Sequence, residues 1–270
     1  EISVIDIESN ILVKEDPDIV QYLKKELESK GVTFYLSSKV ISTKTNEKSV
    51  QLLLERESEH VSIQSEKVLV AAGRTSNADL VQAEKAGIKT DRGYILVNEH
   101  METNVPSVYA VGDIVPGWQL AHVAYDEGII AVENIAGYDK KMDYSCVPRS
   151  VFTSPEICSV GYSEKEAKKK FDQVGVYTFP LQANAKALIH GNGRAEGMVK
   201  MLIEEKYGEI LGFSIVGHHV NELVSEVTTV MSMEGTVEEI AHAIHPHPSL
   251  SEMIKEVSLL SLGRPLHIQE

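Results

Sequence analysis

The sequence is poor in cysteine, with only Cys146 and Cys158 among 270 residues. A pair separated by 12 positions forms neither a CxxC zinc motif nor a disulfide framework. We interpret both as small buried residues, and we expect a reducing compartment, the cytoplasm. No apolar run approaches the roughly 18 residues of a membrane span, so no membrane partner is expected.

Basic residues are also scarce, because 26 Lys and Arg face 40 Asp and Glu for a formal net charge of −14. Sequence-independent nucleic-acid binding and anionic membranes both require basic surface, so we expect neither as a partner. The hydrophobic share of 43% and the charged share of 24% are those of a globular protein. At roughly 100–200 residues per domain, the length favours two domains or one domain with pieces of others.

The first part of the chain has the pattern of a parallel sheet. Ile2–Ile7 predicts a strand, Asp16–Gly31 predicts a helix capped by Asp16, and Val32–Leu36 predicts a second strand. Strand, helix and strand within about 36 residues form a βαβ unit. A small meander is then predicted at Val40–Thr45, Val50–Glu55 and Glu66–Ala71.

The middle and the end of the chain differ in pattern. The middle predicts two helices, Asn77–Gly87 and Ala124–Gly137, and two strands, Tyr94–Val97 and Val108–Val111. The end predicts strands followed by helices, which indicates a separate α+β domain after the α/β part. Its strands are Ile157–Tyr162, Val174–Pro180, Gly197–Ile203 and Ile210–Val216, and its helices are Val220–Glu234 and Ser249–Leu262.

The segment Thr103–Asp113 is specific for ligand binding. Its apolar strand delivers Gly112 and Asp113 to the carboxyl edge of a sheet, where open α/β folds bind ligands. Gly112 permits a close backbone approach, and the Asp113 carboxylate can accept hydrogen bonds from sugar hydroxyls. Asp6 also follows a strand, where an acid can bind the ribose of NAD, although a lone acid there is more often a solvated turn residue.

The octet His245–Glu252, HPHPSLSE, precedes the last predicted helix. Ser249 is a candidate N-cap, and Glu252 would be the acid of its capping box. Glu252 could have only that structural role. Alternatively, it accepts a hydrogen bond from His247 and fixes the tautomer of the ring, as the acid of a catalytic triad does.

Together these motifs make the chain resemble the dihydrolipoamide dehydrogenases, within the flavin-dependent pyridine nucleotide-disulfide oxidoreductases. The resemblance is co-linear over essentially the whole sequence. The segments that carry it are the strand ending at Asp6, the turn Ala71–Arg74, the motif ending at Gly112-Asp113, the segment Leu120–His122 and the pair His247 and Glu252. The family's flavin-binding GxGxxG and its CxxxxC redox pair are absent, so we expect the chain to correspond to the C-terminal part of such an enzyme.

The resemblance implies three domain pieces. Residues 1–72 would be the second half of the NAD-binding domain, 73–145 the central domain that completes the FAD site, and 146–270 the interface domain of a homodimer. The last domain contains two apolar helical stripes that we expect to mediate dimerisation. They are Leu223, Val227 and Val230 in one helix and Ile254, Val257 and Leu260 in the other.

The resemblance also implies the roles of individual residues. Asp113, beside Gly112, would bind the ribityl chain of FAD, and His247 would exchange protons with the substrate dithiol while Glu252 orients it. The pyrimidine edge of the flavin would meet the backbone of Gln119, Leu120, Ala121 and His122. The NAD site would be lined by Asp6, Val40 and Gly73.

The implied reaction passes electrons from dihydrolipoamide to a disulfide, then to FAD and NAD⁺. The implied partner is the lipoyl domain of a 2-oxoacid dehydrogenase complex or of the glycine cleavage system. Glutathione and mercuric reductases share the scaffold, and a non-catalytic dimerisation fragment is a further alternative. HPHPSLSE is most similar to the lipoamide form, and an acid at Asp6 suits NAD more than NADP.

Overall fold

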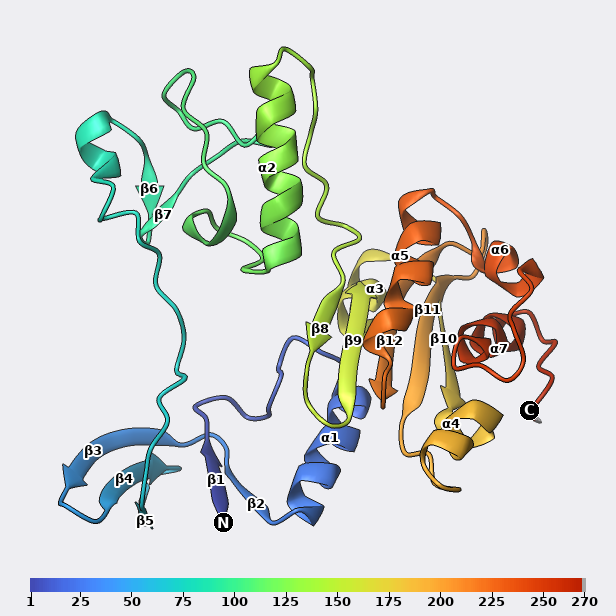
Figure 1. Cartoon of the computed structure of the whole chain (residues 1–270), viewed down its shortest axis with the longest axis horizontal. Coiled ribbons are helices and arrows are strands. Elements are labelled where there is room, and N and C mark those ends of the chain that lie inside the picture. Colours follow the sequence, from blue (N-terminus) through green and yellow to red (C-terminus); the bar gives the residue numbers. More distant parts are fainter. Residues whose placement is uncertain (269–270) are drawn as a thin grey trace. The chain divides into compact units, whose positions relative to one another are not determined.

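The computed structural model describes residues 1–268 and consists of two compact units (Figure 1). One unit combines Glu1–Val68 with the chain from Cys146 onward, and the other is Leu69–Ser145. The assignment of 1–72, 73–145 and 146–270 to NAD, FAD and interface domains stays a prediction. Gln269 and Glu270, which the third range includes, lie outside the described residues.

A five-stranded antiparallel sheet forms the centre of the first unit, in the order β10-β11-β12-β9-β8. Four of its strands lie within two residues of their predicted bounds, and the short β8 was not predicted. Residues on both faces of β11 and β12 are buried, which explains their continuous apolar sequences. The strands are β8 (Arg149–Val151), β9 (Glu156–Gly161), β10 (Val174–Pro180), β11 (Met198–Glu204) and β12 (Ile210–Gly217).

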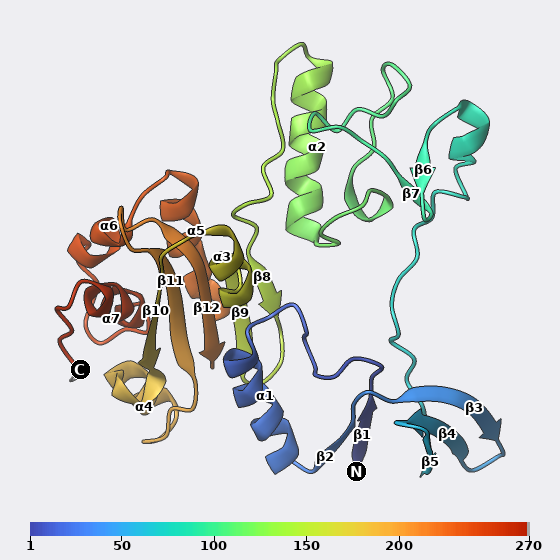
Figure 2. The ribbon, with the colours of Figure 1, turned by 180° about the vertical axis from the view of Figure 1, so that it is seen from behind.

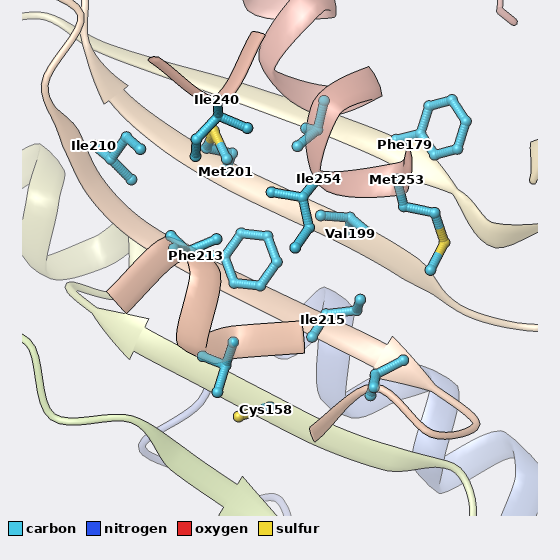
Figure 3. Packing of buried hydrophobic residues seen from close by; sticks show 14 of the residues in the cluster. Cys158, Phe179, Val199, Met201, Ile210, Phe213, Ile215, Ile240, Met253 and Ile254 are labelled. Carbon is cyan, nitrogen blue, oxygen red and sulfur yellow. The ribbon is translucent and has the colours of Figure 1, made fainter. Parts of the chain in front are cut away.

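One face of this sheet is covered by α5 (Val224–Ser232), α6 (Val237–His242) and α7 (Glu252–Ser261). Figure 3 shows Phe213 and Ile254 in the resulting core. The six residues predicted to form dimerisation stripes belong mainly to this core: Val227, Ile254 and Val257 are fully buried in their own domain. For these three residues the expectation was wrong, because an apolar helix face can be buried by its own sheet as well as by a second subunit.

The opposite face of the sheet is covered by α1 (Pro17–Ser29) and α3 (Glu164–Lys170). Figure 2 shows α1 beside β9 and β12, where Ile19 and Leu23 pack against Ile157 and Val216. The short helix α4 (Ala185–His190) follows β10. Neither α3 nor α4 was predicted, because each is only about two turns long.

A buried ion cluster joins α1 to the sheet. The Lys200 Nζ lies 3.1 Å from Asp16 Oδ2, 2.9 Å from Asp18 Oδ2 and 2.6 Å from Glu164 Oε2. The predicted position of Asp16 before α1 is correct, but its carboxylate does not cap that helix. Instead its Oδ1 accepts a hydrogen bond from the Glu164 backbone N–H, because burial beside Lys200 turns the side chain toward the sheet.

The remaining strands of this unit form two small sheets. The predicted parallel pair is present as β1 (Ile2–Ile5) and β2 (Val32–Tyr35), and an antiparallel meander follows. The third meander strand was predicted at Glu66–Ala71 but lies at Glu59–Ser65. Glu57 and Ser58 have positive φ angles of 48° and 71° and form a tight hairpin turn. The third strand therefore starts directly after this turn, seven residues earlier in the sequence than predicted. The meander strands are β3 (Lys39–Thr45), β4 (Val50–Arg56) and β5 (Glu59–Ser65).

The second unit contains one long helix, α2 (Ala121–Ile135), and the two-stranded pair β6 (Thr90–Asp91) and β7 (Tyr94–Ile95). The helix predicted at Asn77–Gly87 is reduced to a 3₁₀ turn at Ala83–Ala86, and Val108–Val111 is extended with one isolated bridge rather than a strand. The first segment is held by turn hydrogen bonds between residues three apart, such as Leu80 N–H to the Asn77 carbonyl, and the second meets Glu102 in a bridge at Tyr109. Helix α2 begins three residues before its predicted start.

Lys200→Met tests the ion cluster. The substitution leaves the Asp16 carboxylate buried without its cation, and we expect a loss of about 3–5 kcal/mol in the free energy of unfolding. Lys168→Met is the control, because Lys168 pairs with Glu164 at the exposed surface and should contribute less than about 1 kcal/mol. Urea denaturation measures both variants; equal losses would contradict a specific role of the buried lysine.

Candidate functional site

The loop between α6 and α7 places His247 beside Glu252. The ring Nδ1 donates a hydrogen bond to Glu252 Oε1 over 2.8 Å, and the peptide bond between His247 and Pro248 is cis. The predicted contact between the two side chains is therefore confirmed. The His247 side chain is 68% exposed, whereas that of Glu252 is 17% exposed.

Glu252 is held through both carboxylate oxygens. Its Oε2 accepts a hydrogen bond from the Ser249 backbone N–H over 2.7 Å, which is one half of the predicted capping box. The other half is absent, since α7 begins at Glu252 itself and the Ser249 hydroxyl contacts the Ser251 hydroxyl instead. Burial alone would raise the pKa of Glu252, but the hydrogen bonds from Ser249 and His247 hold it below its ordinary value.

This geometry makes His247 a suitable proton-transfer group. When Nδ1 carries the proton that the carboxylate accepts, Nε2 of a neutral ring keeps its lone pair. The exposed ring can therefore take a proton at Nε2 while Glu252 stabilises the imidazolium that forms. The arrangement can support general acid–base chemistry, which contributes roughly 10²–10⁴ in rate.

The second unit brings together the residues predicted to contact a flavin. Gly112 has a φ of +78°, and a Cβ atom added to it would lie 3.4 Å from Ala124 Cβ in α2. Gln119 and Leu120 immediately precede that helix, which starts at Ala121. The orphan N–H groups of a helix start are suited to the carbonyl oxygens of a flavin pyrimidine edge. His122 also lies in that first turn.

A buried acid that the sequence analysis missed supports this turn. Glu127 is 1% exposed on α2, and its Oε2 accepts the Gly112 backbone N–H over 2.6 Å. The Tyr144 hydroxyl donates to its Oε1 over 2.8 Å. Burial, reinforced by Glu127, raises the pKa of Tyr144 well above its ordinary value. The sequence did contain a signal for this residue. Glu127 shares one face of the helix with the apolar residues Val123 and Ala131, and an acid on a buried face needs partners.

Asp113 is half-exposed, and its carboxylate Oδ2 accepts a hydrogen bond from Arg74 Nη2 over 2.5 Å. The arginine was not predicted as a site residue, because it is 39 positions away in sequence. A carboxylate has about four acceptor positions, so the ion pair leaves capacity for a sugar hydroxyl. These residues fit the ribityl part of FAD.

The residues predicted for NAD are divided between the two units. Asp6 lies at the carboxyl end of β1, and its Oδ1 accepts the Glu8 backbone N–H over 3.0 Å. Val40 is exposed in β3, whereas Gly73, with a φ of +127°, belongs to the second unit. An acid at the carboxyl end of a parallel strand suits a ribose, and the role of all three residues stays a prediction.

Cys146 and Cys158 are not joined in a disulfide, as expected. Cys158 is fully buried, and burial raises the pKa of its thiol. Cys146 is only partly buried against the core of the five-stranded sheet, so its interpretation as a buried residue was wrong. It is the residue at which the chain returns from the second unit to the first.

Comparison with known proteins identifies the family. The family model described as pyridine nucleotide-disulphide oxidoreductase matches residues 1–128, and the model of the dimerisation domain of the same proteins matches residues 147–258. The chain belongs to this family. The expected fold, an α/β part followed by an α+β domain, agrees with that membership, and FAD and NAD are the cofactors of these oxidoreductases.

The relatives are longer proteins. The chain is 38% identical to the mitochondrial dihydrolipoyl dehydrogenase of Pisum sativum, with 99% of this chain and 54% of that protein covered. A dihydrolipoyl dehydrogenase of Bacillus subtilis is also 38% identical, with 98% and 56% covered. The chain thus spans about half the length of the curated relatives that it matches.

A solved structure shares the fold. The HOCl-induced flavoprotein disulfide reductase RclA of Escherichia coli, in its Cu(II) complex, has a TM-score of 0.88 at 27% identity. The match covers 96% of this chain and 58% of RclA. In the part of the chain that the structure describes, no helix combines the length and the apolar character needed to cross a membrane.

Glu252→Gln tests the depressed pKa. A carboxyl whose folded-state pKa lies below its unfolded value contributes stability above the unfolded pKa, and this contribution disappears as the pH falls through the folded pKa. We therefore expect the stability difference between wild type and Glu252→Gln to be fully present above about pH 5 and to shrink below about pH 4. Urea denaturation at several pH values measures it, with Glu47→Gln on an exposed turn as the control for losing one surface charge.

Proposed function

We propose that this chain provides the C-terminal part of a flavin-dependent dihydrolipoamide dehydrogenase. The observation that carries the proposal is the His247–Glu252 hydrogen bond of 2.8 Å on an exposed loop of the dimerisation domain. The dihydrolipoyl dehydrogenases that are 38% identical over nearly the whole chain support this substrate class.

His247 would act on the substrate dithiol. A thiol must lose its proton before its sulfur can attack a disulfide, and free thiols have a pKa near 8.5. The Nε2 atom of His247 takes that proton in dithiol oxidation and returns one in the reverse direction. Glu252 holds the His247 ring in one orientation and stabilises its charged form. The substrate thiol must therefore approach the Nε2 side of the ring.

FAD, when bound, would carry electrons between the disulfide and NAD⁺. The residues of this chain that would hold it are Asp113 at the ribityl hydroxyls and the first turn of α2, Gln119–His122, at the pyrimidine edge. Gly112 keeps the backbone close enough for that contact. In the first unit, Asp6 and Val40 would contact the nicotinamide nucleotide.

The dimerisation-domain match supports a homodimer, which would place His247 of one subunit opposite the disulfide and flavin of the other. We propose a lipoyl domain of a 2-oxoacid dehydrogenase complex or of the glycine cleavage system as the partner. For the location, we propose the cytoplasm; the relatives include bacterial proteins and mitochondrial ones.

A second candidate is another disulfide reductase of the same family. The similarity to RclA, whose name states a disulfide reductase, supports it. The two functions differ in substrate: a dihydrolipoamide dehydrogenase oxidises a dithiol with NAD⁺, whereas a reductase consumes a reduced nicotinamide nucleotide. Initial rates in both directions on the flavin-loaded protein distinguish them.

The proposed homodimer is tested by sedimentation of the chain at micromolar concentration. Because the apolar stripes of α5 and α7 are buried in their own core, we expect the interface to involve the exposed loop that contains Ile244 rather than those stripes. Ile244→Asp should therefore shift the equilibrium toward monomer, and Val176→Asp, on β10, is the control. A wild-type monomer would contradict the proposal.

His247→Gln tests the proton transfer. In the flavin-containing enzyme, the variant should keep the flavin absorption spectrum and lose roughly 10²–10⁴ in dithiol oxidation rate. Glu252→Gln should lose less, because the base is retained and only its orientation and charge stabilisation change. Dithiol oxidation at the wild-type rate by His247→Gln would remove the catalytic assignment.

A further inference from the structure

The octet contains a second histidine that is buried. The side chain of His245 is 6% exposed, and its Nε2 lies 2.8 Å from Glu226 Oε1 on α5. Its Nδ1 lies 3.2 Å from the backbone oxygen of Ala243. His245 is thus fixed through both ring nitrogens, whereas His247, two residues later, is exposed.

Both partners of the His245 ring are acceptors. A carboxylate and a backbone carbonyl have no proton to donate, so the two contacts are hydrogen bonds at the same time only if both ring nitrogens carry protons. The shorter contact, to Glu226 on α5, is a hydrogen bond when Nε2 carries the ring proton. Lys255 from α7 donates to the Ala243 oxygen over 2.7 Å, so that carbonyl is held as well.

The other end of the loop is also fixed. Asn184 Nδ2 donates to the Ser249 backbone oxygen over 3.0 Å, and Glu252 accepts the Ser249 N–H. Between the two ends the chain contains two prolines, whose φ angles are locked by their rings. With few free torsions, a displacement of His245 moves the His247 ring directly.

We propose that His245 is a positioning residue, whose buried ring, held against Glu226 on α5 and the Ala243 carbonyl, sets the place and orientation of His247. The inference rests on the proposed function of His247 as the proton-transfer group. It assigns to the first histidine of the octet a role distinct from that of the second: His245 anchors the loop and touches no substrate.

The first measurement is the ¹⁵N NMR spectrum of the histidine rings in the 270-residue chain at pH 7. We expect the ring proton of His245 on Nε2, toward Glu226, and that of His247 on Nδ1, toward Glu252. In Glu226→Gln the signals of both rings should shift, those of His247 because the loop moves. Unchanged His247 signals in that variant would overturn the proposal.

The second measurement is kinetic and uses the flavin-containing enzyme. In His245→Asn we expect kcat and kcat/KM for dithiol oxidation to fall together by about 10-fold to 10²-fold, since misplacing a reactive group by about 1 Å has an effect of that size. Reduction of an artificial acceptor by NADH, which does not need His247, should change less than twofold. His242→Asn is the matched control, because His242 forms a similar but exposed pair with Glu238.

The outcomes separate the two claims. If His247→Gln is inactive and His245→Asn is fully active, the positioning role is wrong and the proposed function is retained. If His247→Gln is active, the proposed function itself is wrong. Should His245→Asn fail to fold, Glu226→Gln, which changes charge and not size, gives the same kinetic comparison.

Discussion

The burial of both faces of the five-stranded sheet is the constraint on which the rest of the first unit depends. Strands β11 and β12 expose almost no surface, so each face requires a cover of helices. Side chains such as Phe213 and Met201 contribute roughly 1.5–3 kcal/mol each when fully removed from water. The same packing that buries them fixes α7 on one face and α1 on the other, and thereby places the first turn of α7, where Glu252 lies.

Buried or half-buried carboxylates organise the functional segments in a recurring way. Glu252 accepts the Ser249 N–H with one oxygen and the His247 ring with the other. Glu127 accepts the Gly112 N–H and the Tyr144 hydroxyl in the same manner. A carboxylate that binds one backbone group and one side chain fixes both at once, since each hydrogen bond to a charged acceptor is roughly twice as strong as a neutral one.

Histidines that pair with a carboxylate in the last third of the chain illustrate how burial separates roles. His245 is almost completely buried, and the ring is held on both sides. His247 and His267 are held only at Nδ1, and at least half of each side chain is exposed. A ring can exchange a proton with a substrate only if one of its nitrogens is accessible at the surface. Proton transfer is therefore open to the exposed histidines and not to the buried His245.

The sequence by itself determined most helices and strands and the contact between His247 and Glu252. The helical period of Asp16–Gly31, the strands of the large sheet and the five-residue spacing of His247 and Glu252 depend on neighbours within a few residues, so a linear pattern contains them. The tertiary structure decided every contact between distant segments: Arg74 with Asp113, Tyr144 with Glu127 and His245 with Glu226. It also decided that the apolar faces of α5 and α7 are buried against their own sheet. The physical reason is that periodicity states that a face must be buried, while only packing in three dimensions selects what buries it.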